Sequence, residues 1–418
     1  MRKKVVNNKC LLIGISGYEQ DVLDSLLELE QLCRTLGLEV VDKFYQKRVK
    51  PDPSYYLGKG KLNKIKNFCK DENIEVVVTN DEITPAQKRN LEKFLNVNVL
   101  DRTQVILRIF LKHATTNEGK LQVEIAKLKY ELPYIVGKGK EFSRLGGGIA
   151  TRGPGEQEAE YTKRYIKKRI RILTKKLEQI KKNREIKRKK RLESYHGIIS
   201  IVGYTNAGKS TLLAQLSQEN VLIKNEMFST LAPLLRKVKL PSGRYVIFSD
   251  TVGFIKKLPH TLVESFHSTL EEIVHSDLIL ILLDVSDHNY QKKLKIVHEV
   301  LYDIGVYNKP YILVFNKIDL CSEDYLSVVK KNYPEAIYIS AKKRQNIIDL
   351  LLKIDKFFDK MEESLILDVP FPKIGEVMKF RDALNLNVIE MRNNSYKLSL
   401  KGPKAVLHQI KKTIQGGF

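Results

Sequence analysis

The stretch Gly203-Tyr204-Thr205-Asn206-Ala207-Gly208-Lys209-Ser210 matches the pattern G-x-x-x-x-G-K-[ST] in full. Its glycines let backbone N–H groups turn toward phosphate oxygens, Lys209 brings a positive charge to the outer phosphates, and the Ser210 hydroxyl is a hard oxygen ligand for Mg²⁺. An apolar run precedes this loop, and a helix signal that includes Thr211 follows it. A buried strand, a glycine turn and a helix N-terminus in this order predict a cradle for the phosphates of a nucleotide.

Two later stretches indicate which base the nucleotide carries. Asn316-Lys317-Ile318-Asp319 ends an apolar strand, and its last carboxylate can accept hydrogen bonds from the ring N–H and the exocyclic amine of guanine. Adenine offers no matching pair of donors and would leave that carboxylate unpaired. The stem of Lys317 can lie along the face of the base, and Ser340-Ala341-Lys342 suits the guanine carbonyl. The ordered set predicts GTP rather than ATP.

Residues between and after these loops complete a magnesium and switch region. Asp250-Thr251-Val252-Gly253 follows an apolar strand and supplies an acid near the metal and a flexible glycine near the third phosphate. Thr230, in Phe228-Ser229-Thr230-Leu231-Ala232, is the candidate for a second Mg²⁺ ligand beside Ser210. The predicted catalytic residues are Lys209, Thr230 and Gly253. The predicted nucleotide contacts are Gly203, Tyr204, Thr205, Asn206, Ala207, Gly208, Lys209, Ser210, Thr211, Phe228, Ser229, Thr230, Leu231, Ala232, Asp250, Thr251, Val252, Gly253, Asn316, Lys317, Ile318, Asp319, Ser340, Ala341 and Lys342.

The residue after Gly253 bears on the rate of hydrolysis. Many GTPases orient the attacking water with a glutamine at this position, but this chain has Phe254, which cannot hydrogen-bond to water. We therefore expect slow intrinsic hydrolysis that a docked partner accelerates by ordering the segments around Thr230 and Gly253. His260 is a weaker candidate for positioning water, because a histidine on the surface of the switch is the favoured explanation.

Composition points to a polyanionic partner. The chain has 418 residues, a net charge of +24 and a pI near 9.6. Its four cysteines, which are far apart in the sequence, predict reduced thiols in a cytoplasmic protein rather than disulfides or a zinc site. No apolar stretch approaches the ~20 residues of a membrane span, and the apolar run near the start is too short for a signal peptide.

Alternating strand and helix signals place the chain in the α/β class, with four expected domains. Residues 1–113 predict a small α/β domain with a parallel sheet, and residues 114–195 predict a basic helical hairpin with a glycine-rich loop. Residues 196–362 predict a GTP-binding domain with a doubly wound sheet, and residues 363–418 a small α+β domain. Within the first domain, Leu57-Gly58-Lys59-Gly60-Lys61 is either a plain basic turn or a second phosphate site.

Apolar residues at 121, 125, 128 and 132, and again at 166, 170, 173, 177 and 180, predict two helices packed along a narrow seam. The glycine-rich stretch between them, from Gly137 to Glu156, predicts an irregular loop whose Lys138, Lys140, Arg144 and Arg152 suit close approach to phosphates. A linker without fixed structure is the alternative.

The second helix carries most of the chain's charge. Between Lys163 and Arg191 there are 16 lysine or arginine residues and two acids, a net charge of +14. Such an excess favours RNA, because each neutralised phosphate releases counterions. A weak peripheral membrane association remains the alternative, although the apolar stripe is narrow and lacks interfacial Trp or Phe.

Beyond the nucleotide motifs, the chain resembles the HflX family of ribosome-associated GTPases, in the Obg-HflX superfamily, over nearly its whole length. The resemblance is carried by the stretches Pro85-Ala86-Gln87, Asp101-Arg102-Thr103, Glu118-Gly119-Lys120-Leu121-Gln122-Val123-Glu124, Leu145-Gly146-Gly147-Gly148, Thr151-Arg152-Gly153-Pro154-Gly155-Glu156, Asp250-Thr251-Val252-Gly253-Phe254-Ile255 and Leu258-Pro259-His260. It implies a monomeric cytoplasmic protein that binds the large ribosomal subunit and its rRNA and separates stalled or idle ribosomes into subunits. It also implies that the tip of the helical domain is pushed toward the peptidyl-transferase region. Some members also use ATP at the N-terminal domain.

The chain departs from the family pattern at two places. Gln157-Glu158-Ala159 stands where Thr-Gln-Leu is usual, and Ala232-Pro233-Leu234-Leu235 stands where an acid and threonines are usual. The first departure affects the expected loop geometry, and the second affects the switch next to Thr230. Two other functions fit the same features: a GTP-regulated RNA-binding or RNA-unwinding protein, and a ribosome-assembly factor.

Overall fold

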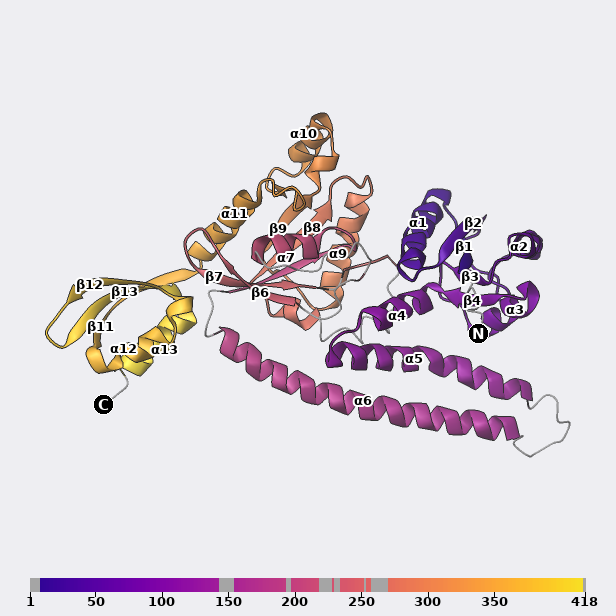
Figure 1. The fold of residues 1–418 in the computed structure, drawn as a ribbon, viewed down its shortest axis with the longest axis horizontal. Coiled ribbons are helices and arrows are strands. Elements are labelled where there is room, and N and C mark those ends of the chain that lie inside the picture. Colours follow the sequence, from indigo (N-terminus) through magenta and orange to yellow (C-terminus); the bar gives the residue numbers. More distant parts are fainter. Residues whose placement is uncertain are drawn as a thin grey trace, which may run out of the picture. The chain divides into compact units, whose positions relative to one another are not determined.

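The computed structural model describes residues 8–142, 154–192, 197–217, 228, 234–251, 253–256 and 270–415 (Figure 1). It forms two compact units. The first consists of Met1–Glu178, Glu226–Leu231 and Lys256–Phe266, and the second of Gln179–Asn225, Ala232–Ile255 and His267–Phe418. No helix in the described part of the chain combines the length and apolar character needed to cross a membrane.

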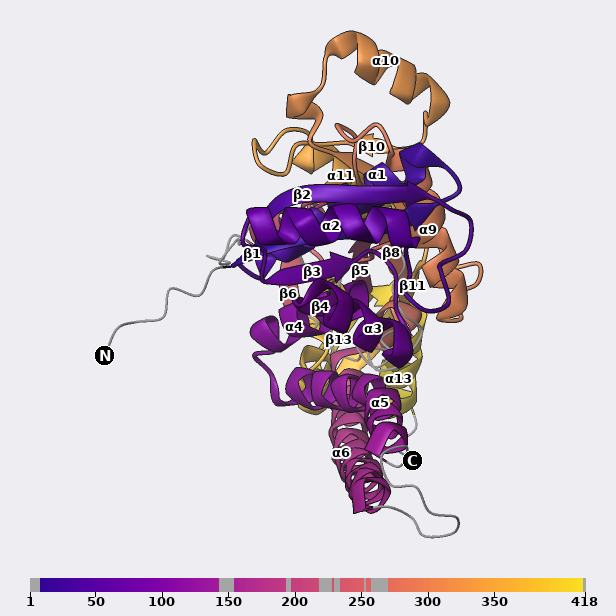
Figure 2. The ribbon, with the colours of Figure 1, turned by 90° about the vertical axis from the view of Figure 1, so that its right-hand side faces the viewer.

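The first unit begins with a four-stranded sheet in the order β2-β1-β3-β4, and all three strand pairs are parallel. The strands are β1 (Lys9–Ser16), β2 (Glu39–Lys47), β3 (Val76–Thr79) and β4 (Asn98–Asp101), and the helices are α1 (Glu19–Thr35), α2 (Lys59–Asp71), α3 (Pro85–Leu95) and α4 (Arg102–His113). The predicted parallel α/β sheet is confirmed. β1 is almost wholly buried, as expected of a strand with helices on both faces (Figure 2).

Local signals explain where these helices begin. Thr84 and Gln87 form a capping box at the start of α3, and Pro85 occupies the first turn, where its missing N–H costs nothing. The stretch Leu57–Lys61 contributes the start of α2, with Gly58 as its N-cap residue. The Gly58 N–H donates to Gln46 Oε1 at 2.9 Å, so this turn has a structural role. A phosphate site at this turn stays a prediction.

The expected pair of long helices is present as α5 (Asn117–Phe142) and α6 (Pro154–Leu192). They lie side by side in Figures 1 and 2, and Arg169 of α6 donates to Glu124 of α5 at 2.9 Å. Ile166 and Leu173 of the predicted stripe are buried, and α5 buries Ile125 and Tyr130.

The expected extent of the loop between them is wrong at both ends. Gly137-Lys138-Gly139-Lys140 belongs to α5, which continues to Phe142, and Pro154-Gly155-Glu156 begins α6. A glycine costs a helix only about 1 kcal/mol relative to alanine, and proline is tolerated in the first helical turn, so neither residue forbids the longer helices. The remaining residues of the predicted loop, 143–153, lie outside the described residues.

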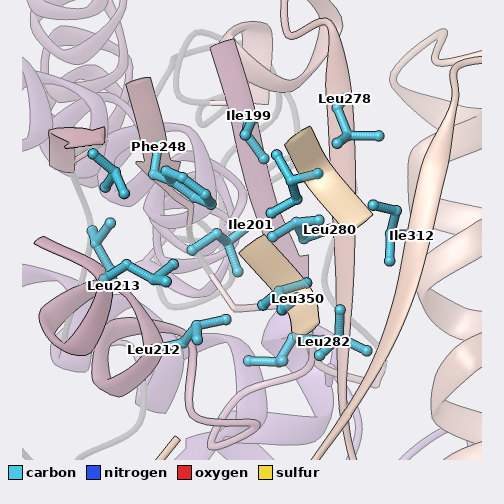
Figure 3. Close-up of a cluster of buried hydrophobic side chains, with 14 of the residues drawn as sticks. Ile199, Ile201, Leu212, Leu213, Phe248, Leu278, Leu280, Leu282, Ile312 and Leu350 are labelled. Carbon is cyan, nitrogen blue, oxygen red and sulfur yellow. The ribbon is translucent and has the colours of Figure 1, made fainter. Parts of the chain in front are cut away.

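The second unit is built on a six-stranded sheet in the order β10-β9-β8-β5-β7-β6. Its strands are β5 (Ile198–Gly203), β6 (Leu234–Lys239), β7 (Tyr245–Asp250), β8 (Leu278–Asp284), β9 (Tyr311–Asn316) and β10 (Ile337–Tyr338), and its helices include α7 (Lys209–Ser217), α9 (Tyr290–Asp303), α10 (Glu323–Asn332) and α11 (Ile347–Asp359). Figure 3 shows the core, in which Leu212 and Leu350 approach the buried residues of the central strands. The predicted doubly wound sheet is confirmed.

One strand of this sheet was not predicted. β6 is antiparallel to β7 and pairs along its whole length, whereas the other strand pairs are parallel. The predicted helix at 261–275 is described only at 270–274, where the chain is helical. Its remainder lies among residues that the structure leaves undescribed.

The end of the chain forms a three-stranded antiparallel sheet in the order β11-β13-β12. β11 (Glu362–Pro370), β12 (Asn385–Met391) and β13 (Ser395–Pro403) carry α12 (Ile374–Met378) and α13 (Lys404–Gln415) over one apolar core. β12 and β13 turn at Asn393-Asn394, and Arg392 N donates to Ser395 O at 2.9 Å. This small α+β fold agrees with the prediction.

Candidate nucleotide site

The phosphate-loop residues lie between the end of β5 at Gly203 and the start of α7 at Lys209. Gly208 has φ +95°, a backbone conformation that favours glycine. A Cβ on Gly208 would lie 2.3 Å from Asn316 Nδ2, and one on Gly203 would lie 2.2 Å from the carbonyl oxygen of Leu282. Close packing therefore favours glycine at both positions, and the backbone conformation of the turn favours it at Gly208 as well.

Lys209 is folded against the loop that precedes it. Its Nζ donates to the carbonyl oxygens of Gly203 at 3.2 Å and Tyr204 at 2.9 Å, and only 7% of the residue is exposed. Burial lowers the pKa of Lys209 to about 8, and the charge of Asp250 opposes that shift. The Lys209 ammonium group is thus held against the phosphate loop, where an anionic phosphate would favour its charged form.

The metal-side residues meet at the ends of two elements. Ser210 Oγ, in the first turn of α7, donates to Asp250 Oδ2, at the end of β7, at 2.7 Å. A hydroxyl and a carboxylate side by side are the hard oxygen donors that Mg²⁺ prefers, so the donor set fits the predicted ion. Among the described residues, no group of three or more His, Cys, Asp or Glu could hold a metal. An ion here would therefore take its other ligands from elsewhere, and Thr230, the predicted second ligand, lies outside the described residues.

Gly253 lies against the phosphate loop. A Cβ at this position would be 2.9 Å from both Lys209 Nζ and Thr205 Cγ2, so only glycine fits without displacement. The next residue holds the two segments together, because Phe254 N donates to Gly203 O at 3.0 Å and Thr205 N donates to Phe254 O at 2.9 Å. The Phe254 side chain is 2% exposed. Thr251 Oγ1 donates to Ile201 O at 2.8 Å, and Val252 is not described.

Asn316 connects three of the predicted loops. Its Nδ2 donates to Ala207 O at 2.8 Å, and its Oδ1 accepts from Ala341 N at 2.9 Å. Asp319 accepts a hydrogen bond from Ser340 Oγ at 2.6 Å, which fixes one carboxylate oxygen. The structure thus brings together the phosphate loop, the Asn316–Asp319 segment and Ser340-Ala341-Lys342, as the sequence predicts.

One partner in this region was missed. Lys317 has φ +67°, and its Nζ lies 2.6 Å from Asp284 Oδ2, at the end of β8. This ion pair aligns the lysine stem that is predicted to lie along the base. Asp284 follows directly on the apolar run of β8, and the carboxyl ends of adjacent parallel strands meet at one edge of a sheet. That position was the signal that could have identified it.

Phe228, a predicted nucleotide contact, has partners in the first unit. Its ring packs edge-on against Phe110 of α4 with centroids 4.6 Å apart, and its carbonyl oxygen lies 2.8 Å from His113 Nδ1. The residue is 4% exposed and has φ +58°. Its role at the nucleotide stays a prediction, as do those of Ser229, Thr230, Leu231 and Ala232, which are not among the described residues.

Comparison with known proteins assigns the chain to a family. Family models described as "GTP-binding GTPase N-terminal", "GTP-binding GTPase Middle Region" and "50S ribosome-binding GTPase" match residues 23–111, 113–191 and 198–317. GTPase HflX of Caldanaerobacter subterraneus subsp. tengcongensis is 44% identical over 88% of this chain and 85% of that protein. GTPase HflX of Lacrimispora saccharolytica is 41% identical over 90% and 89%.

Among solved structures, a GTP-binding protein from Sulfolobus solfataricus in complex with GDP is 28% identical and covers 84% of this chain and 99% of that one, with a TM-score of 0.45. The family models and the HflX relatives span the N-terminal, middle and nucleotide-binding parts of the chain. The chain therefore belongs to the HflX family, and it is a GTP hydrolase whose nucleotide-binding domain is of the ribosome-associated class.

Proposed function

We propose that this GTPase binds the large ribosomal subunit through its rRNA and couples GTP binding and hydrolysis to ribosome remodelling, separating stalled or idle ribosomes into subunits. The observation that carries the proposal is the joining of two features in one chain. One is a set of loops suited to guanine nucleotide, held together by Asn316, and the other is α6, with a net charge of +14 between Lys163 and Arg191. Such a helix neutralises many phosphates, as an rRNA partner requires.

The site residues divide the work of phosphoryl transfer among them. Lys209 supplies charge at the outer phosphates, and Asp319 selects guanine through the carboxylate that Ser340 positions. Ser210 and Asp250, with Thr230, would hold Mg²⁺, which when bound with GTP or GDP neutralises phosphate charge. Gly253 lets the backbone approach the third phosphate beside Lys209.

The residue after Gly253, Phe254, leads us to expect a slow intrinsic rate of GTP hydrolysis. The Phe254 side chain has no hydrogen-bonding group and is 2% exposed, so it cannot orient the attacking water. The bound ribosome would order the segments around Thr230 and Gly253, which is how partners of other GTPases act. We therefore expect turnover to depend on the large subunit.

The first test is co-sedimentation with purified large subunits in GTP, GDP and a non-hydrolysable GTP analogue. Binding should be strongest with the analogue and weakest with GDP, because only the triphosphate state favours the ordered switch. Equal binding in all three states would contradict coupling between nucleotide and ribosome.

We also expect the protein to act as a monomer. Analytical ultracentrifugation of the chain alone should show a monomer.

The second test separates ribosome splitting from simple RNA binding. Residues 143–153 are replaced by a Gly-Ser sequence of equal length, which leaves α5 and α6 intact. Loss of subunit separation in a sucrose gradient, with unchanged affinity for rRNA fragments, is the result that splitting predicts. Retained separation would favour the alternatives of a GTP-regulated RNA-binding or RNA-unwinding protein or a ribosome-assembly factor.

The proposal places the protein in the cytoplasm, where its partner is. A weak peripheral membrane association is the competing use of the basic helix. Co-sedimentation with anionic vesicles at physiological salt, in competition with large subunits, distinguishes them. The ribosome should displace the protein from the vesicles.

A further inference from the structure

One face of α6 carries large side chains that are exposed to solvent. Tyr161 is 74% exposed, Tyr165 is 62% exposed and Ile172 is 41% exposed. Residues four and seven apart lie on one face of a helix, so these three form a row. Other side chains of α6, such as Ile166 and Leu173, are buried, and α5 lies alongside α6 (Figure 1). Packing between α5 and α6 therefore does not explain the tyrosines.

Cations border this row. Arg164, Lys168 and Lys175 are exposed and lie three or four residues from a member of the row, and Arg171, also exposed, directly precedes Ile172. Arg164 pairs with Glu160 at 3.0 Å across one turn, and an exposed pair of this kind contributes little to stability. The face therefore combines flat apolar rings with positive charge.

This combination selects among anionic partners. Phosphates alone, as a duplex presents them, need lysine and arginine but no exposed rings. A membrane surface needs a broad apolar face, whereas here the apolar row is a single line of three residues among cations. Unpaired bases stack on aromatic rings while neighbouring cations neutralise the strand's phosphates.

We propose that Tyr161 and Tyr165 stack on unpaired bases of an RNA strand whose phosphates contact Arg164, Lys168 and Lys175. The two tyrosines are about 6 Å apart along the helix axis, which suits contacts to neighbouring bases of one strand. The inference rests on the proposed function only in taking RNA as the partner of α6. It adds that α6 recognises single-stranded or splayed-out RNA rather than a regular duplex.

The absence of tryptophan from the chain permits a direct test. Tyr161→Trp and Tyr165→Trp each introduce a single indole in the full-length protein, and a base stacked on an indole quenches its fluorescence. The probes are an unstructured 12-nucleotide RNA and a 12-base-pair RNA duplex, each at saturating concentration. Tyr18→Trp is the matched control, because Tyr18 is 77% exposed and lies outside α6.

Quenching at positions 161 and 165 by the single strand, with little by the duplex and none at position 18, is the expected result. Quenching by both RNAs alike, or by neither, would overturn the proposal. So would a spectral shift with anionic vesicles in the absence of any response to RNA.

Affinity measurements give an independent readout. Tyr161→Ala and Tyr165→Ala should each weaken binding of the single strand about tenfold, while the Phe variants retain wild-type affinity because the ring is kept. Affinity for the duplex should not change. Equal losses for both RNAs, or losses in the Phe variants, would contradict stacking.

The outcome for the ribosome is separable from these results. If no stacking is seen but large subunits still accelerate GTP turnover, the stacking proposal fails and the proposed function stands. If the tyrosines stack on RNA but ribosomes neither bind nor accelerate turnover, the stacking proposal stands and the proposed function fails.

Discussion

At the scale of single residues, the geometry around Asp319 makes base selectivity testable. One of its oxygens accepts from Ser340 Oγ at 2.6 Å, so its carboxylate is held in one orientation. Asp319→Asn replaces an acceptor by a donor, which mismatches guanine but matches xanthine, whose ring carries a carbonyl in place of the amine. We expect affinity for GTP to fall on the order of 100-fold, from loss of about 3 kcal/mol of charge-assisted hydrogen bonding, and xanthosine triphosphate to bind better than GTP.

Isothermal titration calorimetry measures the affinity of the Asp319→Asn variant for GTP and for xanthosine triphosphate. Asp324→Asn is the matched control, because Asp324 is an exposed acid of α10 and its loss should leave GTP affinity unchanged. Unaltered GTP binding in the Asp319 variant would mean that the base lies elsewhere.

Ser210 makes the metal requirement testable in the same way. Ser210→Ala removes the hydroxyl that now donates to Asp250 and leaves the fold of α7 intact. The Mg²⁺ concentration for half-maximal GTP turnover should rise at least tenfold, since one hard oxygen ligand is lost. Ser322→Ala, at the N-cap of α10, serves as control and should not move the Mg²⁺ dependence. An unshifted Mg²⁺ curve in the Ser210 variant would exclude it as a ligand.

At the scale of elements, the sequence was most informative where a chemical motif follows an apolar run. Asp250 and Asn316 both stand at the ends of buried parallel strands, so their types and positions predict the site and the sheet together. The Leu57–Lys61 turn and the capped start of α3 were equally predictable, because their signals are local.

Features that depend on distant partners could not be predicted. β6 pairs with β7, and the three cations among its six residues suit a surface loop as well as an edge strand. The burial of Phe228 depends on Phe110, which lies more than one hundred residues earlier in the chain. α5 continues through Gly137–Lys140 despite weak local preference, which shows that two glycines are a cost to a helix rather than a barrier.

Arg244 is a further element-scale feature without a sequence signal. It is 1% exposed and pairs with Asp355 of α11 at 3.0 Å, with Asp359 at 2.7 Å and with Glu362, the first residue of β11, at 3.0 Å. The turn between β6 and β7 is thereby joined to the helix and strand that lead into the C-terminal sheet. Ser242 reinforces this junction by donating to Asp355 through both its N–H and its hydroxyl.

Removing the cation should destabilise this junction strongly. Arg244→Ala leaves Glu362, whose side chain is 2% exposed, without its main counter-charge, and breaking a buried pair in this way costs about 3–5 kcal/mol. Urea unfolding of the second unit, followed by circular dichroism, measures the loss. Arg392→Ala is the control, because its pairs with Asp368 and Glu390 are exposed and should contribute less than about 1 kcal/mol. Equal effects of the two substitutions would contradict the assigned role.

At the scale of the whole molecule, the charge on α6 governs how binding responds to salt. Lys175 and Lys176 are exposed and lie within its basic segment. Replacing both by serine should weaken binding to the large subunit. The negative slope of log K against log salt should become shallower by about two, one for each phosphate that is no longer neutralised. Lys411→Ser with Lys412→Ser, on exposed positions of α13, is the matched control. A slope unchanged by the α6 substitutions would place the RNA-binding surface on another part of the molecule.

We propose that this chain joins a guanine-selective site, without a water-orienting side chain after Gly253, to a helix suited to rRNA. The measurement that tests it most directly is the steady-state rate of GTP turnover with and without purified large ribosomal subunits, at saturating GTP and Mg²⁺ and with excess ATP as competitor. We predict a slow rate for the protein alone, a rise of at least tenfold with large subunits, and no inhibition by ATP. The same rate with and without large subunits, or inhibition by ATP, would contradict the claim.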